Sequence, residues 1–266
     1  MNIVKTLAGA RSSKVELVEI DQKQYVLKTA EIDEIKNEKE FYRLLSEHAI
    51  PTLHIYEAED VKENQLLLEY VEGSPTLGRH MTYELVEAWG GVVRQMHDIT
   101  YTSAANMSTL NVEEMNWQEF LEDILKKSEK KTSLPQHLVQ NIKQKLLSLF
   151  TMKPTSYALL HADLHTNNVL IRGNELCLFD KGSDVFYGDP LYDLAIIGIE
   201  FPHETFITVD DPEHFKDREY LDRFIAGYGR DFTKDPAFEL YVLLRAFERF
   251  PNPFEKYLKE TMQGII

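Results

Sequence analysis

The chain lacks the features that mark secreted or membrane-spanning proteins. Its single cysteine, Cys177, cannot form an intrachain disulfide and lies in an apolar run, so we expect a buried, unreactive thiol. No apolar run approaches the roughly 18 residues that a membrane-spanning helix needs. The first ten residues carry Lys5 and no apolar segment long enough for a signal peptide. These absences predict a cytosolic protein with no membrane partner.

Basic residues are also scarce, because 29 Lys and Arg face 44 Asp and Glu, for a net charge of −15. This charge disfavours nucleic acid and anionic membrane surfaces as partners, whereas it would attract a cationic small molecule. The apolar share of 43% is that of a soluble globular protein. At 266 residues the chain can bury one large core or form two lobes.

Short β-like runs dominate the first seventy residues. Residues 15–20 and 25–28 flank a polar triplet, which predicts a hairpin. Residues 31–47 contain no proline or glycine and predict a helix. Residues 54–58 and 66–70 predict two further strands. The cluster Glu-Gly-Ser-Pro at 72–75 then breaks the pattern and predicts a boundary between lobes.

The rest of the chain predicts a larger, mostly helical lobe. A helix with apolar residues at helical spacing follows Thr82, which is placed to cap it. Gly90 and Gly91 weaken that helix and are tolerable if another helix packs close. Gly173-Asn174 predicts a tight hairpin turn. Further helices are predicted at 117–127, 136–150, 190–200, 215–228 and 238–262, and the hairpin strands at 169–171 and 176–179. Pro251 and Pro253 are expected to break the last of these helices. We therefore expect an α+β, two-lobed fold, with a sheet-containing N-terminal lobe at 1–72 and a larger lobe at 73–266.

The strongest chemical signal is an acid, an amide and a second acid around this hairpin. Asp163 and Asn168 stand five residues apart after an apolar run, and Asp180 ends the next apolar run. This spacing matches a kinase catalytic loop, with His161 two residues before the first acid. Asp163 would accept or orient the proton of the attacking hydroxyl, and Asn168 and Asp180 would hold a divalent metal. The pattern predicts phosphoryl transfer.

A lysine and a glutamate in the first lobe suit the same chemistry. Strand alternation places Val26 and Lys28 on one face, where the amine could reach phosphate oxygens while Val26 lies against a purine. Glu38 falls on the apolar face of the following helix, between Ile35 and Tyr42. A buried carboxylate needs a cation, and Lys28 is the obvious partner. We expect this ion pair to orient the nucleotide phosphates.

Residues 9–13 read Gly-Ala-Arg-Ser-Ser and form a weaker signal. A turn there could direct backbone N–H groups and the hydroxyls of Ser12 and Ser13 toward phosphate. An ordinary surface loop is the alternative.

His161, Asp163 and His165 also allow a different reading, as ligands of a metal hydrolase. No second histidine pair with ligand spacing follows, and that reading leaves the other candidate residues without a role. We interpret His161 as structural, with its ring hydrogen-bonded to the backbone near Asp180.

The segments HADLHTNNVLI, LFDKG and GDPLYDLA resemble the aminoglycoside phosphotransferase family of the protein-kinase-like superfamily. The resemblance extends over most of the chain, through YVLK, NEKEFYRLL and LLLEYVEG. It implies a hinge at Glu69, Tyr70 and Val71 that contacts adenine through backbone groups, with Leu170 under the base and Val26 above it. It implies ATP or GTP and Mg²⁺ as cofactors, and a structural role for residues 188–190 and Asp193.

The sequence departs from the family pattern in three places. Ala162 stands where glycine is usual, and Lys181 follows the metal-binding acid where an aromatic residue is common. The last residues, 263–266, lack the acidic, aromatic tail of some aminoglycoside kinases. That missing tail argues against a literal antibiotic-resistance role.

The acceptor implied by the resemblance is a small hydroxylated molecule. A protein kinase would carry an arginine in the catalytic loop and a long activation segment, and both are missing here. A pseudokinase that binds nucleotide without turnover is the remaining alternative. We expect a monomer or a homodimer. The acids that could attract a cationic acceptor are Glu200, Glu204, Asp210, Asp211 and Glu213. A solvated surface acid is the alternative for each of them.

Overall fold

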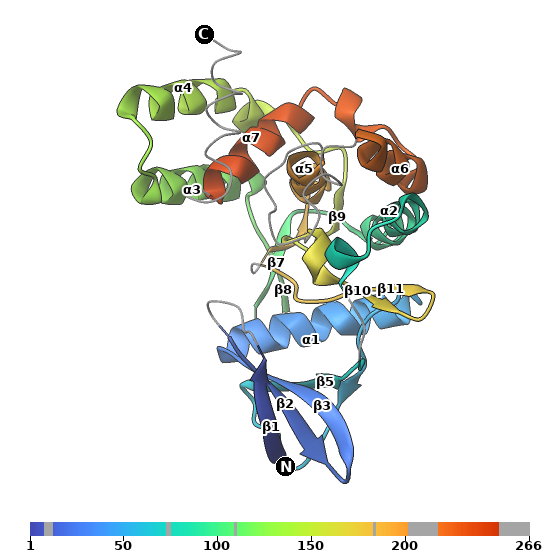
Figure 1. Cartoon of the computed structure of the whole chain (residues 1–266). Helices are drawn as coiled ribbons and strands as arrows, with labels where there is room; N and C mark the ends of the chain where they lie inside the picture. The colour runs from blue at the N-terminus through green and yellow to red at the C-terminus, as the bar shows by residue number, and fades with distance from the viewer. Residues whose placement is uncertain (8–12, 73–75, 109–110, 183–184, 202–217, 250–266) are drawn as a thin grey trace.

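An antiparallel sheet of five strands opens the structure. The computed structural model describes residues 1–7, 13–72, 76–108, 111–182, 185–201 and 218–249. The sheet order is β1-β2-β3-β5-β4, and α1 connects β3 to β4. In Figure 1, α1 lies between this sheet and the rest of the chain. The bounds are β1 Asn2–Leu7, β2 Lys14–Ile20, β3 Lys23–Thr29, α1 Ile32–Glu47, β4 Ile55–Tyr56 and β5 Gln65–Glu69.

Alternation along β3 divides its side chains between two environments, as predicted. Leu27 packs with Val18 and Leu67 in a small cluster on one face of the sheet. Val26 packs against the main core instead, and Lys28 is buried beside α1. The strand therefore presents an amine to the interior of the protein, where it needs a charged partner.

The second part of the chain combines helices with a further sheet. Its helices are α2 Tyr83–His97, α3 Trp117–Lys131, α4 Gln136–Leu146, α5 Leu191–Glu200, α6 Arg218–Tyr228 and α7 Phe238–Glu248, with short 3-10 turns at Leu77–Arg79, Leu149–Thr151, Thr166–Asn168 and Phe232–Lys234. Thr82 caps α2 as predicted, because its side chain accepts a hydrogen bond from Leu85 N. The helix predicted at 238–262 ends at Glu248 in the described part, and residues 250–262 lie outside it. No helix among the described residues is long and apolar enough to cross a bilayer.

A second five-stranded sheet, with the order β6-β9-β12-β7-β8, lies among these helices and was not predicted. Its strands are two to four residues long, too short for an alternating pattern to emerge. The second lobe is nevertheless mostly helical, as predicted, because its six helices in the described part of the chain are each 10 to 15 residues long. The bounds are β6 Thr100–Tyr101, β7 Ala105–Ser108, β8 Asn111–Glu114, β9 Tyr157–Leu159 and β12 Val185–Gly188.

The predicted hairpin forms separately, as β10 (Val169–Arg172) paired with β11 (Glu175–Leu178). Gly173 turns the chain with φ +61°, a value that favours glycine. Cys177 lies on β11 opposite Leu170 and is fully buried. Burial raises the pKa of this thiol to about 11, in line with the expected inert cysteine.

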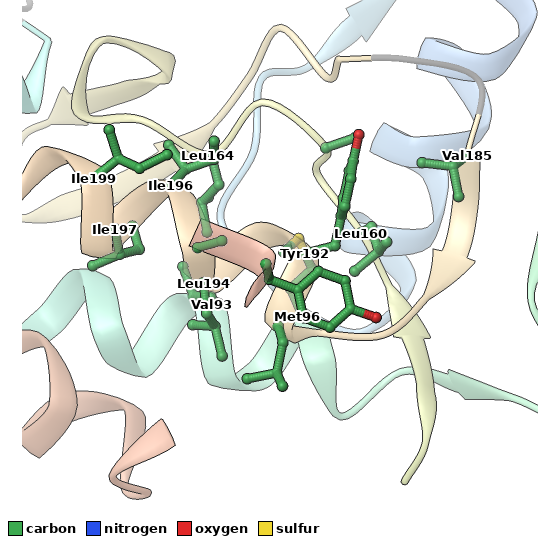
Figure 2. Close-up of a cluster of buried hydrophobic side chains, with 14 of the residues drawn as sticks. Val93, Met96, Leu160, Leu164, Val185, Tyr192, Leu194, Ile196, Ile197 and Ile199 are labelled. Carbon is green, nitrogen blue, oxygen red and sulfur yellow. The ribbon is translucent and has the colours of Figure 1, made fainter. Parts of the chain in front are cut away.

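Helix α5 forms the centre of the main core. Its residues from Leu191 to Ile197 are all buried, so it is apolar almost all round. Figure 2 shows Leu160 and Leu164, which flank Asp163 in sequence, in one cluster with side chains of α5 and α2 such as Leu194 and Val93. Both leucines are fully buried. The loop that carries Asp163 is thus anchored at both ends by packing.

Candidate active site

The loop from His161 to Asn168 is held by hydrogen bonds from two helices. Asp193 of α5 accepts the backbone N–H groups of His161 and Ala162, each at 2.7 Å. Arg245 of α7 donates to the carbonyl of Ala162. Ala162 itself has φ +64°, a left-handed conformation that favours glycine. The structural role predicted for Asp193 therefore has a direct geometric basis.

Asp163 is surrounded by donors. Asn168 Nδ2 donates to its backbone carbonyl at 3.0 Å and to its Oδ2 at 3.1 Å. Arg249 pairs with Oδ1, and His165 Nε2 lies 3.4 Å from Oδ2. Burial alone would raise the pKa of Asp163, but Arg249 and then His165 hold it well below its ordinary value. The carboxylate is therefore ionised at neutral pH and can accept a hydrogen bond from a hydroxyl.

Lys28 joins the two parts of the chain at this site. Its Nζ lies 2.7 Å from Glu38 Oε2 and 2.8 Å from Asp180 Oδ1. Burial opposes the charged amine, but Glu38 and Asp180 together hold the pKa of Lys28 above its ordinary value. Tyr42 donates to Glu38 at 2.8 Å and accepts from Asp180 N at 3.2 Å. Glu38, predicted to need a cation, has one.

Asp180 adopts a left-handed backbone conformation, with φ +56°. Such strain in a non-glycine residue persists only where its surroundings fix it, and it gathers at functional sites. His161 contributes to that fixing, because its Nε2 hydrogen-bonds the neighbouring Phe179 carbonyl at 2.9 Å.

The hydrolase reading does not fit this geometry. Asp163 N donates to His161 Nδ1 at 3.3 Å, so both ring nitrogens of His161 are engaged. Burial lowers the pKa of His161, which keeps the ring neutral. Residues 161–165 form a loop rather than the extended strand that would align three ligands on one face.

Asp180 and Asn168 suit a magnesium ion better than a transition metal. Mg²⁺ binds through one or two protein oxygens together with substrate phosphates and water. Asp180 offers a carboxylate with 37% of its side chain exposed, and Asn168 brings an amide beside it, with Nδ2 3.4 Å from Asp180 O. Within the described ranges, no three His, Cys, Asp or Glu side chains are grouped as for a metal ion. The donor set fits the predicted metal.

The residues expected around the nucleotide are less completely described. Ser12 lies outside the described residues. Ser13 Oγ is buried and finds no hydrogen-bond partner in the described part of the chain, which would suit a phosphate oxygen. Val26, Val71 and Leu170 are half-buried against the main core.

Glu69 and Tyr70 lie where the hinge was predicted. Glu69 N donates to the His54 carbonyl at 2.9 Å, and the Glu69 carboxylate pairs with Arg172 of β10 at 2.7 Å. Tyr70 is half-buried. The Glu69 pair links the sheet of the first lobe to the hairpin that carries Leu170.

Glu200 is neither an acceptor-attracting acid nor a solvated surface acid, the two alternatives weighed for it, because it is not at the surface. Its carboxylate is fully buried and accepts hydrogen bonds from Thr166 N and Oγ1 in the loop that carries Asp163. The apolar run that precedes Glu200 is the signal that could have indicated burial. The other four acids of that group, at 204–213, lie outside the described residues.

Lys181, Arg245 of α7 and Arg249 just after α7 complete the surroundings. Lys181 is buried, donates to the carbonyls of Gly182 and Val185, and lies over the ring of Phe186, so its amine is satisfied inside the protein. Arg245 and Arg249 were not predicted. Arg245 stands in the apolar run of α7, and a buried arginine requires a partner. That pattern could have indicated its role in the sequence.

Three comparisons relate the chain to known proteins. A homoserine kinase of Zymomonas mobilis subsp. mobilis is 26% identical over 251 residues, covering 86% of this chain and 72% of that protein. Aminoglycoside phosphotransferase APH(4)-Ia, in a ternary complex with ADP and hygromycin B, superposes with a TM-score of 0.68 at 15% identity, covering 97% of this chain and 88% of the other. Choline kinase LicA of Streptococcus pneumoniae superposes with a TM-score of 0.62 at 16% identity, covering 97% of this chain and 87% of the other.

The structural matches confirm the predicted α+β, protein-kinase-like fold. The sequence model described as the phosphotransferase enzyme family matches residues 3–240, most of the chain. The chain belongs to the phosphotransferase enzyme family.

Proposed function

We propose that the protein transfers the γ-phosphoryl group of ATP or GTP to a hydroxyl of a small molecule, with Mg²⁺. The observation that carries the proposal is the contact of Lys28 with both Glu38 and Asp180, which stand far apart in sequence. Phosphoryl transfer needs a cation for the phosphates, a metal-binding acid and an acid for the hydroxyl, within one site. Residues 1–72 would form the nucleotide-binding lobe and residues 73–266 the catalytic and acceptor-binding lobe.

Each residue has a role that its surroundings support. Lys28, oriented by Glu38, binds nucleotide phosphates, and Ser13 Oγ donates to them. The backbone of residues 69–71 contacts the base between Val26 and Leu170. Asp180 and Asn168 hold Mg²⁺, which neutralises phosphate charge when bound.

Asp163 positions the acceptor for the reaction. Its ionised carboxylate accepts a hydrogen bond from the acceptor hydroxyl. The hydroxyl oxygen forms a bond to the γ-phosphorus while the bond from that phosphorus to the bridging oxygen of ADP breaks. The hydroxyl proton passes to Asp163 and then to solvent, so charge and atoms balance.

The relatives suggest which acceptors to test. The names of the similar proteins point to three compounds, which are homoserine, hygromycin B and choline. Each of them carries a free hydroxyl. They range from a zwitterion to a polycation, so the fold fixes the reaction and leaves the acceptor open. A screen should measure ADP release from Mg-ATP and GDP release from Mg-GTP against all three, with sugars added.

The substitution Asp163→Asn tests the proposal directly. The amide keeps the size of the side chain but cannot take the hydroxyl proton, so we expect turnover to fall by about 10²- to 10⁴-fold. Nucleotide affinity, measured by calorimetry, should change little because Asp163 does not contact the phosphates in this scheme. Full turnover in the variant, or loss of nucleotide binding with it, would contradict the assigned role.

A further inference from the structure

Arg249 occupies the position that an acceptor hydroxyl would need. It stands at the end of α7 and pairs through Nη2 with Oδ1 of Asp163. Its side chain is 20% exposed, so the guanidinium borders solvent rather than the sealed core. Asp163 is the hydrogen-bond partner of Arg249 within the described residues, although a guanidinium carries five donors. The group has capacity for another planar anion.

The contacts of α7 with the catalytic loop fix the position of Arg249. Arg245, four residues earlier on α7, is 2% exposed and donates to the Ala162 carbonyl. Its guanidinium lies 3.8 Å from the ring centroid of Tyr192. Residues four apart share a helix face, so the same face that fixes Arg245 to the loop directs Arg249 to Asp163.

The charge around Asp163 is unsuited to a cationic acceptor at the reacting end. Arg249 meets Oδ1, and His165 lies against Oδ2. The nearby acid Glu200 is fully buried and committed to Thr166. A cation next to the reacting hydroxyl would be repelled by Arg249, although the whole chain is acidic. A carboxylate there would instead offer Arg249 a bidentate partner.

We propose that Arg249 binds a carboxylate of the acceptor, which makes the substrate a hydroxy acid or a hydroxylated amino acid. This inference rests on the proposed kinase function. Binding of the carboxylate draws the guanidinium away from Asp163 Oδ1 and leaves that oxygen to the acceptor hydroxyl. Without such an acceptor Asp163 stays paired, which limits transfer of the phosphoryl group to water. Arg249 is then a specificity-determining residue of the site.

The test uses acceptors in matched pairs that differ only at the carboxyl group. L-Homoserine, L-serine and D-glycerate are each compared with their carboxamides, and choline and hygromycin B represent cationic acceptors. We expect the wild-type protein to prefer at least one acid over its amide by about 10- to 100-fold in kcat/KM. Arg249→Gln should remove that preference, mainly through KM for the acid, and should raise ADP release in the absence of acceptor. Arg249→Lys keeps the charge and should restore part of the preference.

Arg223→Gln is the matched control, because Arg223 is an exposed arginine of α6 paired with Glu219 and Glu87, away from the catalytic loop. It should leave the acid preference unchanged. Thermal unfolding of each variant, and calorimetry of the acid with the ADP-bound protein, separate a binding defect from a folding defect.

The outcomes distinguish this inference from the kinase function. If amides or cationic acceptors react as well as the acids, the carboxylate proposal is wrong and the kinase function stands. The same conclusion follows if Arg249→Gln lowers kcat equally for acids and amides, since Arg249 would then act on the phosphoryl group. If no compound yields ADP and no nucleotide binds, the proposed function fails and this inference fails with it.

Discussion

At the scale of single residues, the site depends on one buried amine. Lys28 is 5% exposed and neutralises Glu38, which is 3% exposed. Removal of one member of a buried pair leaves an uncompensated charge, which destabilises a protein more than loss of both members. The pair should therefore affect folding as well as the proposed nucleotide binding, and the two effects can be separated.

Lys28→Met should lower the free energy of unfolding by about 3–5 kcal/mol, because Glu38 is left buried without a cation. Adding Glu38→Gln should recover most of that loss, since the amide needs no counter-charge and still accepts from Tyr42. Urea unfolding measures the stability of the single and of the double variant. Nucleotide affinity should stay weak in the double variant, because the amine is still missing. Lys36→Met is the control, because Lys36 pairs with Glu63 at the surface. Additive losses in the double variant would contradict this account.

Sequence reasoning predicted some site residues and missed others for physical reasons. Strand and helix periodicities are local, and they were sufficient to orient Lys28 and Glu38 toward each other. Arg249 lies 86 residues from Asp163, and no local period connects them. Glu200 was misplaced because its charge was considered without the apolar run before it.

At the scale of elements, two helices approach each other closely through glycine. A Cβ at Gly227 of α6 would lie 1.7 Å from Glu87 O, and one at Gly90 of α2 would lie 2.2 Å from Phe224 O. The condition set by the sequence, that another helix packs on the Gly90-Gly91 pair, is thus met by α6. Gly91 is different, because a Cβ there would come no nearer than 3.8 Å to Gly227 O.

Gly90→Ala and Gly227→Ala should each lower the free energy of unfolding by about 1–3 kcal/mol, because the methyl group forces α2 and α6 apart. Gly91→Ala has room for its methyl group and should raise the free energy of unfolding by about 0.5–1 kcal/mol, because alanine is preferred over glycine in a helix. Denaturant unfolding of the three variants side by side makes the comparison. Equal effects at positions 90 and 91 would rule out close helix contact as the cause.

Elements were predictable where they are long. The first-lobe helix and the hairpin at Gly173 appear close to the predicted bounds because each has a periodic pattern or a defined turn residue. The second sheet escaped prediction because β6 and β12 find their partners far along the chain. Such pairing depends on tertiary packing rather than on local propensity.

At the scale of the whole molecule, several buried acids make stability depend on pH in opposite directions. Burial opposes the charge of Asp193, but His97 and the backbone of His161 hold its pKa below its ordinary value. Asp189, just before α5, accepts hydrogen bonds from Leu191 N and Tyr241 OH, but burial outweighs them and raises its pKa to about 6. Between about pH 4 and pH 6 the folded protein therefore holds a proton at Asp189 that the unfolded chain has lost.

This difference predicts the behaviour of Asp189→Asn. Because the raised pKa stabilises the folded state only at low pH, the wild-type protein should lose stability relative to the variant as pH rises from 4 to 7. The shift of about two pKa units corresponds to a relative change of about 3 kcal/mol. Unfolding in urea across that range gives both curves. A constant gap between them would show that Asp189 is ionised throughout.

The lone thiol of Cys177 gives the protein a built-in reporter. It sits on the strand opposite Leu170, beneath the proposed adenine position, and a reagent can reach it only when β11 separates from its surroundings. The rate of thiol alkylation would therefore report how often that region opens, without a dye attached to the protein. A bound nucleotide should lower the rate of Cys177 alkylation.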